Sequence, residues 1–212
     1  MPVVNYVTDD SVVKKDFTTS SSKKALVPNG VKGNAFYEDE SKVVSISADH
    51  FSRAINAKGI SWQLLPDLGR TGSAITSFPV TAAEQVLNIT APTLQYDIYT
   101  FSEGEVAVQA YFSPTLNFQN STTGLQFALS IDDGTPQILS VNKEDAPSNS
   151  GVWNKWVAEN IIIVPAKLVL SKPGKHVLKY WMVSSGVVLQ KIVLNFGTVK
   201  QSYLGPPETI VK

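Results

Sequence analysis

The stretch KHVLKYWMVSSGVVLQKIVLNFG, residues 175–197, decides the fold expected for this chain. Two apolar runs, 176–183 and 187–196, flank the short loop 184–186. This pattern is typical of a β-hairpin with a glycine-containing loop. An isolated hairpin is only marginally stable in water, so both runs need a second sheet to cover them.

The two runs differ in how cleanly they alternate. In the first run Leu178, Tyr180 and Met182 share one face, and Lys179 marks the opposite face, which should look outward. In the second run Gln190 is the single polar residue on a face that is otherwise apolar. Gln190 is therefore the residue of this stretch that the strand pattern does not explain.

Similar runs recur at short spacing along the chain. Residues 105–112 and 125–131 alternate strictly, and Asp132-Asp133-Gly134 is a turn signal before residues 137–141. Further strand candidates are residues 43–51, 60–65, 74–80, 94–100 and 168–170. Many short strands, together with 12 Pro and 13 Gly, predict an all-β fold of the sandwich or jelly-roll type.

The N-terminal part differs from the rest. Residues 3–7, VVNYV, fit one strand, but residues 8–34 are polar and contain TTSSSKK and several breakers. We therefore expect an arm or linker over residues 1–40 and one β-sandwich domain over residues 41–212. The segment 151–160 fits a helical turn as well as a twisted strand, and the pattern leaves both open.

The composition excludes several partners. Lys plus Arg equals Asp plus Glu, at 18 each among 212 residues, so no net charge draws the chain to nucleic acid or to an anionic membrane. No apolar run reaches the roughly 20 residues of a membrane span. There is no cysteine, which excludes disulfides and thiolate metal sites. We expect neither nucleic acid nor a membrane as a partner.

Two N-glycosylation sequons occur, Asn88-Ile89-Thr90 and Asn120-Ser121-Thr122. Such sequons fit surface loops of a secreted protein. The N-terminus has neither the basic nor the apolar region of a signal peptide. We therefore expect secretion as part of a longer precursor.

The sequence contains no convincing catalytic set. His50 and His176 are the only histidines, and neither has a metalloprotease or nucleophile-elbow context. Asp132 and Asp133 form a turn, which suits a solvated loop better than glycoside hydrolysis. Aromatic residues beside polar ones remain, and such platforms hold the apolar C–H faces of sugars. The four tryptophans are Trp62, Trp153, Trp156 and Trp181, and packing in the core is the alternative role of each.

Five ordered motifs resemble the C-terminal domain of family 115 glycoside hydrolases, which are xylan α-1,2-glucuronidases. They are SADHF at 47–51, GRTGSA at 69–74, YFSPTLNF at 111–118, WMV with GVVLQKIV over 181–193, and SYLGPPE at 202–208. The resemblance covers about residues 43–208. It implies a jelly-roll β-sandwich similar to family 6 and 35 carbohydrate-binding modules, cut away from a catalytic domain that this chain lacks.

The resemblance also implies ligand-binding residues. The stretch GVWNKW is similar to a loop in which the first Trp stacks on sugar and the second packs inside, so Trp153, beside Asn154, is the expected platform. Arg70, on a loop with two glycines, is expected to be exposed and to pair with a uronic carboxylate. Trp62 and Ser184 complete the expected set, Ser184 as a wall of the sugar cleft.

Those modules also hold a structural calcium between two carboxylates of the first strand and an acid of the last strand. Here Ser47 stands at the first carboxylate position and Gln190 stands in the last strand. Asp49 is left as the one candidate metal ligand. Because calcium takes six or more oxygen ligands, we expect no cofactor.

The resulting hypothesis is a non-catalytic carbohydrate-binding module for xylan or glucuronoxylan, next to the upstream catalytic domain of a parent α-glucuronidase. The alternative is a structural domain that packs on that catalytic domain or on a second subunit and has no sugar affinity. Its aromatic residues would then be interface anchors. Independent catalysis by this chain is the third alternative.

Overall fold

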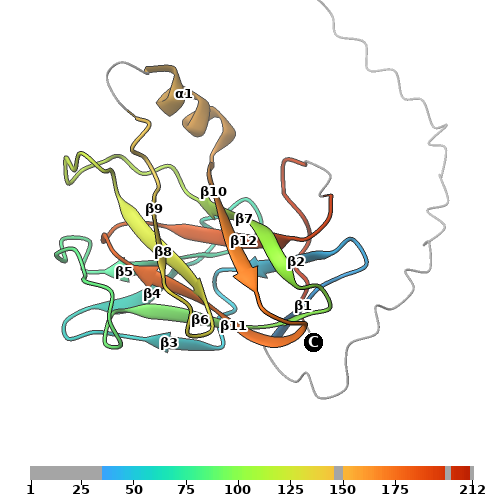
Figure 1. Ribbon diagram of the computed structural model, residues 1–212. Helices are drawn as coiled ribbons and strands as arrows, with labels where there is room; N and C mark the ends of the chain where they lie inside the picture. The colour runs from blue at the N-terminus through green and yellow to red at the C-terminus, as the bar shows by residue number, and fades with distance from the viewer. Residues whose placement is uncertain (1–34, 146–149, 199–201, 211–212) are drawn as a thin grey trace, which may run out of the picture.

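Two β-sheets packed face to face make up the computed structural model of the chain, which describes residues 35–145, 150–198 and 202–210 (Figure 1). The first sheet, sheet A, contains β1 (Ala35–Tyr37), β3 (Arg53–Ile55), β6 (Thr93–Thr100), β8 (Gln126–Ile131), β9 (Gln137–Ser140) and β11 (Gly174–Met182). The second, sheet B, contains β2 (Val43–Ser47), β4 (Ser61–Leu65), β5 (Ala74–Phe78), β7 (Gly104–Phe112), β10 (Ile162–Leu170) and β12 (Leu189–Asn195). The predicted all-β jelly-roll sandwich is confirmed.

The core lies between the two sheets and follows the period of two that defines a half-buried strand. In β10 every second residue from Ile162 to Leu170 is buried, and the residues between them are exposed. Side chains from the neighbouring strand β7, and from β8 and β11 in the facing sheet, continue the same cluster. Its largest fully buried members include Tyr96, Phe112 and Phe127. The inward faces predicted for residues 105–112 and 125–131 are therefore confirmed.

The predicted hairpin over residues 175–197 is wrong. β11 pairs with β6 and β8 in sheet A, whereas β12 pairs with β7 and β2 in sheet B. The six residues 183–188 cross from one sheet to the other, a distance that a chain of this length can span at about 3.3 Å per residue. The two runs need each other as cover, so they lie in facing layers and not side by side.

Gln190 marks an irregularity in β12. The pairing of β12 with β7 shifts register between Leu189 and Lys191, so Leu189 and Ile192 both reach the core. The Gln190 side chain links two loops: Oε1 accepts from Arg70 N at 3.0 Å, and Nε2 donates to Ser113 Oγ at 2.8 Å. The polar residue on the apolar face is therefore a hydrogen-bonded bulge.

The boundary expected between residues 40 and 41 lies too late in the chain. β1 pairs in parallel with β6 through Ala35, Phe36 and Tyr37, and Phe36 is fully buried. The sandwich therefore includes residues that were assigned to the arm, because one short strand with a single large apolar side chain gives little periodic signal. The strand expected at residues 3–7 lies outside the described residues.

The segment that the pattern left open is a helix, α1 (Ser150–Glu159), which projects beyond one end of the sandwich (Figure 1). Trp156 packs on the edge of the core, and this anchors the helix. Among the described residues, no helix is long and apolar enough to cross a membrane.

Candidate functional site

The outer face of sheet B carries a small apolar cluster of its own. Val43, Tyr111, Ile161 and Val193 are buried there, although their positions alternate with those of the core residues. Two of them, Tyr111 and Ile161, line a hollow together with part of residues 202–210, here called the C-terminal segment, which runs beside this face. This segment shapes the candidate site.

Backbone pairing fixes the far end of the C-terminal segment. Thr209 N donates to Ser45 O, and Tyr37 N donates to Thr209 O, both at 3.0 Å. The Thr209 hydroxyl accepts from Ser45 N at 3.0 Å, and Ile210 forms a β-bridge with Phe36. The segment therefore ties β1 to β2, and so one sheet to the other.

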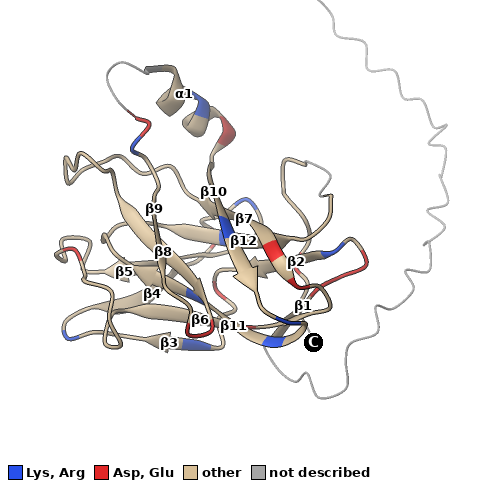
Figure 2. Ribbon diagram, viewed as in Figure 1, with Lys and Arg blue, Asp and Glu red and all other residues tan. Residues whose placement is uncertain are grey.

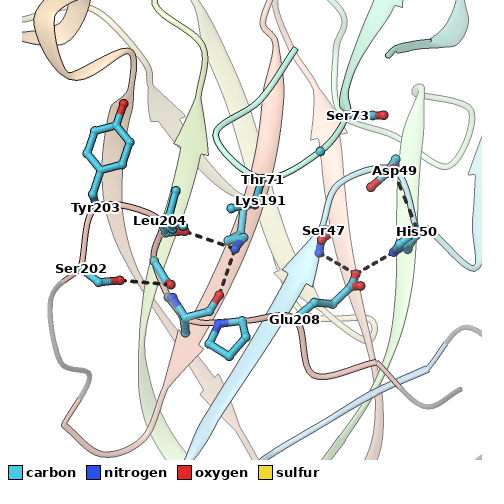
Figure 3. A pocket seen from close by; sticks show the side chains of 14 residues that line it. Ser47, Asp49, His50, Thr71, Ser73, Lys191, Ser202, Tyr203, Leu204 and Glu208 are labelled. Carbon is cyan, nitrogen blue, oxygen red and sulfur yellow. Dashed lines mark hydrogen bonds and ion pairs between the residues drawn. The ribbon is translucent and has the colours of Figure 1, made fainter. Parts of the chain in front are cut away.

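Lys191 holds the middle of the segment from below. Its side chain rises from β12, is 5% exposed, and its ammonium donates to Pro206 O at 2.9 Å and to Leu204 O at 3.5 Å (Figure 3). Burial lowers the pKa of Lys191, and the negative charge of Glu208 opposes that shift. An ammonium that bonds two carbonyl oxygens fixes the path of the backbone on either side of Gly205.

One side of the segment borders a pocket of about 630 Å³, the Lys191 pocket. Glu208 accepts there from His50 Nδ1 at 2.7 Å and from Ser47 N at 3.3 Å, and His50 Nε2 lies 3.9 Å from Asp49 (Figure 3). Hydroxyl groups of Thr71 and Ser73 line the opposite wall. The polar groups of this pocket largely satisfy one another.

The other side borders a second hollow of about 630 Å³, the Arg70 cleft. The side chains that line it include a cation, a carboxylate, two phenols and two amides. The lining residues are Arg70, Gln109, Tyr111, Glu159, Ile161, Ile163, Asn195, Ser202, Tyr203, Gly205 and Pro206. The cleft thus joins the loop after β4, the end of α1, the outer face of sheet B and the C-terminal segment.

Arg70 is the charged group of this cleft. Its Nε donates to Glu159 O at 3.0 Å, Nη2 donates to the same oxygen, and Nη1 donates to Tyr203 O at 2.5 Å. A guanidinium has five N–H donors, so two remain. No carboxylate among the described residues forms an ion pair with Arg70. The guanidinium is held in place by neutral carbonyls, and the Glu159 side chain, which lines the same cleft, forms no ion pair with it.

Tyr203 and Tyr111 form the aromatic walls. The Arg70 guanidinium lies 4.0 Å from the centre of the Tyr203 ring, a cation–π contact, and Tyr203 is still 61% exposed. Tyr111 lies beneath Gly205 and donates to Gln109 Oε1 at 3.1 Å. Burial raises the pKa of Tyr111, and the charge of Arg70 works against the rise. Tyr111 is therefore a neutral hydroxyl at physiological pH.

The structure disperses the residues expected to bind ligand. Arg70 lies in the cleft, but it is partly covered and bonded, not a freely exposed loop residue. Trp153 and Asn154 lie on α1, whose last residue, Glu159, lines the cleft. With a rise of about 1.5 Å per residue, Trp153 is about 9 Å along the helix axis from Glu159. Trp153 lines neither pocket, and its role stays a prediction.

The structure argues against Trp62 and Ser184 as ligand residues. Trp62 packs on the core, with its ring 5.9 Å from Tyr180, and its indole N–H donates to Ile55 O at 3.0 Å. Ser184 is 1% exposed, and its hydroxyl accepts from Gln126 N at 3.0 Å. A buried crossing between sheets contains Ser184, so it cannot form the wall of a cleft.

Asp49 has few neighbouring side chains that could serve as further metal ligands. It lies at the rim of the Lys191 pocket, where His50 and Glu208 already pair with each other. Within residues 35–145, 150–198 and 202–210, no group of three or more His, Cys, Asp or Glu side chains is arranged to hold a metal ion. The arrangement gives no reason to place a cation at Asp49.

Sequence reasoning missed Tyr203 and Lys191 as site residues. The signal available was SYLGPPE, which was interpreted only as an extended tail and a family motif. Charge gives no help, because Lys, Arg, Asp and Glu are scattered over the described ribbon and do not gather at this site (Figure 2).

Comparison with known families agrees with this architecture. The family described as "Glycosyl hydrolase family 115 C-terminal domain" matches residues 35–208, which include every described strand. The chain belongs to this family. The match begins at β1 and ends at Glu208, so residues 202–208 of the C-terminal segment, which separates the two pockets, are part of the family 115 domain.

A solved structure supports the fold of this family 115 domain. A family GH115 4-O-methyl-α-glucuronidase, BtGH115A, described with specificity for decorated arabinogalactans, is similar over 82% of this chain, with a TM-score of 0.54 and 16% sequence identity. The matched region is 19% of that enzyme. The chain therefore spans about a fifth of the length of that relative.

Carbohydrate-binding modules are also among the similar structures. The C-terminal family 6 module of a laminarinase from Zobellia galactanivorans covers 72% of this chain at 14% identity, with a TM-score of 0.45. A family 6 module of a Cellvibrio mixtus lichenase, in complex with cellotriose, covers 73% at 12% identity, also with a TM-score of 0.45. Each aligns over 98% of its own length. No curated protein matches the chain.

Proposed function

We propose that this domain is a non-catalytic carbohydrate-binding module that binds uronate-decorated xylan in the Arg70 cleft. The observation that carries the proposal is the Arg70 guanidinium, which has two spare N–H groups and forms no ion pair with a described residue, at the wall of an open, aromatic cleft. A carboxylate matches a guanidinium in charge and in spacing. A uronic acid is a sugar that carries such a carboxylate.

The other walls suit the rest of a sugar ring. The exposed ring of Tyr203 offers a face for sugar C–H groups, and Ile161 and Ile163 extend the apolar floor. Gln109 and Asn195 offer amides for hydroxyl groups from the outer face of sheet B. Trp153, on α1, is the second platform we propose for a longer chain.

The module is proposed to act as part of a secreted enzyme with an upstream catalytic domain, which it would hold close to glucuronoxylan. Membership of the family and the similarity to part of a glucuronidase support this setting. The described residues offer no catalytic set at this site: Lys191, His50 and Glu208 all face partners within the protein. Release of glucuronic acid by the isolated chain would contradict this.

Titration with paired ligands tests the proposal. We expect xylo-oligosaccharides that carry a uronic acid to bind more tightly than undecorated ones, by about tenfold to a hundredfold, which is the value of one charged hydrogen-bonded pair. Arg70→Gln, which removes the charge, should abolish this preference. Tyr203→Ala should weaken the binding of both kinds of ligand by about threefold to tenfold, because one stacking contact is lost.

Arg53→Ala is the matched control, since it removes an exposed arginine from β3 in the other sheet. It should leave binding unchanged. Equal affinity of decorated and undecorated ligands would reject Arg70 as the uronate contact. Retention on insoluble xylan that survives Trp153→Ala would reject Trp153 as a platform.

The second candidate function is a structural domain with no sugar affinity. It is favoured by exposed apolar side chains at the end of the sandwich that carries the crossing 183–188. Leu116 is 58% exposed, and Phe118, which packs on Gly186, is 51% exposed. This role predicts no retention on any xylan, glucan, mannan or pectin, together with association with the upstream part of the parent enzyme.

A further inference from the structure

We infer that Asn88 is an N-glycan attachment site of the folded domain and that the second sequon, at Asn120, is not. Asn88 lies on the loop between β5 and β6, in a turn closed by Ala91 N donating to Asn88 O at 3.0 Å. Thr90 N and Thr90 Oγ1 donate to Asn88 Oδ1 at 2.8 and 2.7 Å. The acceptor amide and the hydroxyl two residues later are therefore already in contact.

The nitrogen to be modified is accessible. All three residues of this sequon are exposed, and no hydrogen bond from Asn88 Nδ2 to a described residue occupies it. An oligosaccharide attached to Asn88 Nδ2 replaces only solvent, because the Asx turn formed by Asn88 uses Oδ1 and not Nδ2.

The surroundings have an unexplained feature that a glycan accounts for. Ile89 is 91% exposed and Val86 is 80% exposed, both beside a hollow of about 640 Å³ that Asn88 lines. Exposed apolar side chains that lie together call for a cover. Lys58 and Asn56 line the same hollow and offer an ammonium and an amide N–H to sugar oxygens.

Asn120 presents a different geometry. It has a left-handed φ of 51°, and its N–H donates to Asn117 O at 3.0 Å. Both backbone groups of the middle residue, Ser121, are held by the Asn117 side chain, at 3.2 and 2.7 Å. No hydrogen bond joins Thr122 to Asn120 among the described residues. Extending this loop around a transferase would require breaking the Asn117 clamp.

The chemistry requires one co-substrate, a polyprenyl-diphosphate-linked oligosaccharide of a secretory pathway. Asn88 Nδ2 attacks the anomeric carbon, a C–N bond forms, the C–O bond to diphosphate breaks, and Nδ2 loses one proton to a base. The inference rests on the secretion that the proposed function includes but not on sugar binding, since the hollow at Asn88 and the Arg70 cleft share no lining residue.

Secretion of the full chain from yeast, behind a removable leader, tests the inference by intact mass with and without peptide N-glycosidase. We expect one oligosaccharide per chain. Asn88→Gln and Thr90→Ala should each remove it, and the matched pair Asn120→Gln and Thr122→Ala should leave it in place. Chain made in bacteria serves as the unmodified reference.

A second readout tests whether the glycan covers the exposed apolar side chains beside Asn88. Enzymatic removal of the glycan should raise binding of a hydrophobic dye, and Ile89→Ser should reduce that rise. Wild-type chain that leaves the secretory pathway without a glycan, or a glycan that persists in Asn88→Gln, would overturn the inference. Occupancy at both sequons would overturn the distinction between them.

Discussion

At the scale of single residues, His176 and Asp132 form an ion pair at the edge of the core. The His176 side chain is 1% exposed, with Nδ1 at 2.7 Å from Asp132 Oδ2 and Nε2 at 2.8 Å from Lys172 O. Burial acts to raise the pKa of Asp132, but hydrogen bonds from His176 and Val177 N and the charge of His176 together lower it. Asp132 therefore stabilises the fold as a carboxylate.

Asp132→Asn should lower the free energy of unfolding at pH 7 by about 1 kcal/mol, because a charged hydrogen bond becomes a neutral one at a half-exposed position. Because folding lowers the pKa of Asp132, this carboxylate stabilises the folded chain at pH values above its unfolded pKa, near 4. The stabilisation is lost as the pH falls through the pKa of the folded state. Urea unfolding between pH 2.5 and 7 should therefore show a flatter acid limb for the variant.

Asp133→Asn is the control for this prediction. Asp133 is the next residue in the same turn, but its side chain is fully solvated, and its pair with Lys179 spans 3.2 Å at the surface. We expect little change in stability and an unaltered acid limb. Equal effects of the two variants would mean that the Asp132 pair contributes nothing specific.

The residue scale is also where sequence reasoning about the site reaches its limit. Arg70 is recognisable as a candidate because it follows a glycine in a loop, but its partners lie 89 and 133 residues away. Nothing local links Arg70 to Tyr203 or to the end of α1. Ser184 was misassigned for the same reason, since its burial depends on the loop and strand that cover it and not on its neighbours in sequence.

At the scale of elements, periodicity located strands well and their partners poorly. Ten of the twelve described strands overlap the expected runs, and β1 and β3 lie outside them. β10 overlaps them only at its end, because Pro165 and Lys167 interrupt an otherwise apolar stretch. Alternation shows which face of a strand is buried. It does not tell a neighbour in the same sheet from a neighbour in the facing sheet, which is why β11 and β12 were paired wrongly.

The loop before β8 gives an element-scale prediction. Gly124 has a φ of +71°, and a Cβ there would lie 2.6 Å from Lys143 N and 2.7 Å from Asn142 Oδ1. Asn142 holds this loop, accepting from Leu125 N at 2.7 Å. Gly124→Ala should therefore cost about 1–2 kcal/mol for the left-handed backbone and about 1–3 kcal/mol more for the displaced loop.

Gly104→Ala separates the two contributions. Gly104 also has a positive φ, +90°, but nothing lies within 4 Å of a Cβ added there. Denaturant midpoints should show only the backbone cost for Gly104→Ala and the larger, combined cost for Gly124→Ala. Equal losses would show that the loop yields freely to the added methyl group.

At the scale of the whole molecule, the two sheets depend on each other through an aromatic centre. Tyr180 lies among Phe127, at 5.6 Å between ring centres, Trp62 at 5.9 Å and Phe112 at 6.4 Å, and so joins residues of both sheets. Tyr96 lies in the same core and donates to Ala48 O at 2.8 Å. Neither phenol can ionise without bringing a charge between the sheets.

Alkaline unfolding should reveal this dependence. Burial raises the pKa of both Tyr96 and Tyr180 above the ordinary value near 10. As the pH rises, the two phenols lose their protons in the unfolded chain before they do so in the folded chain. The free energy of unfolding is therefore constant with respect to these groups below about pH 10 and falls above it, by about 1.4 kcal/mol per tyrosine at pH 11. Tyr180→Phe should remove the contribution of one tyrosine to this loss of stability. The measurement is the free energy of unfolding in urea between pH 7 and 11.

Comparison of two variants makes this prediction specific. The Tyr180 hydroxyl donates to no described residue, so Tyr180→Phe should leave the stability at pH 7 unchanged, whereas Tyr96→Phe should cost about 1 kcal/mol through the lost bond to Ala48. Both should flatten the alkaline limb equally, because each removes one ionisable group from the same core. A limb as steep as that of the wild type in both variants would place the cause of alkaline unfolding outside the space between the sheets.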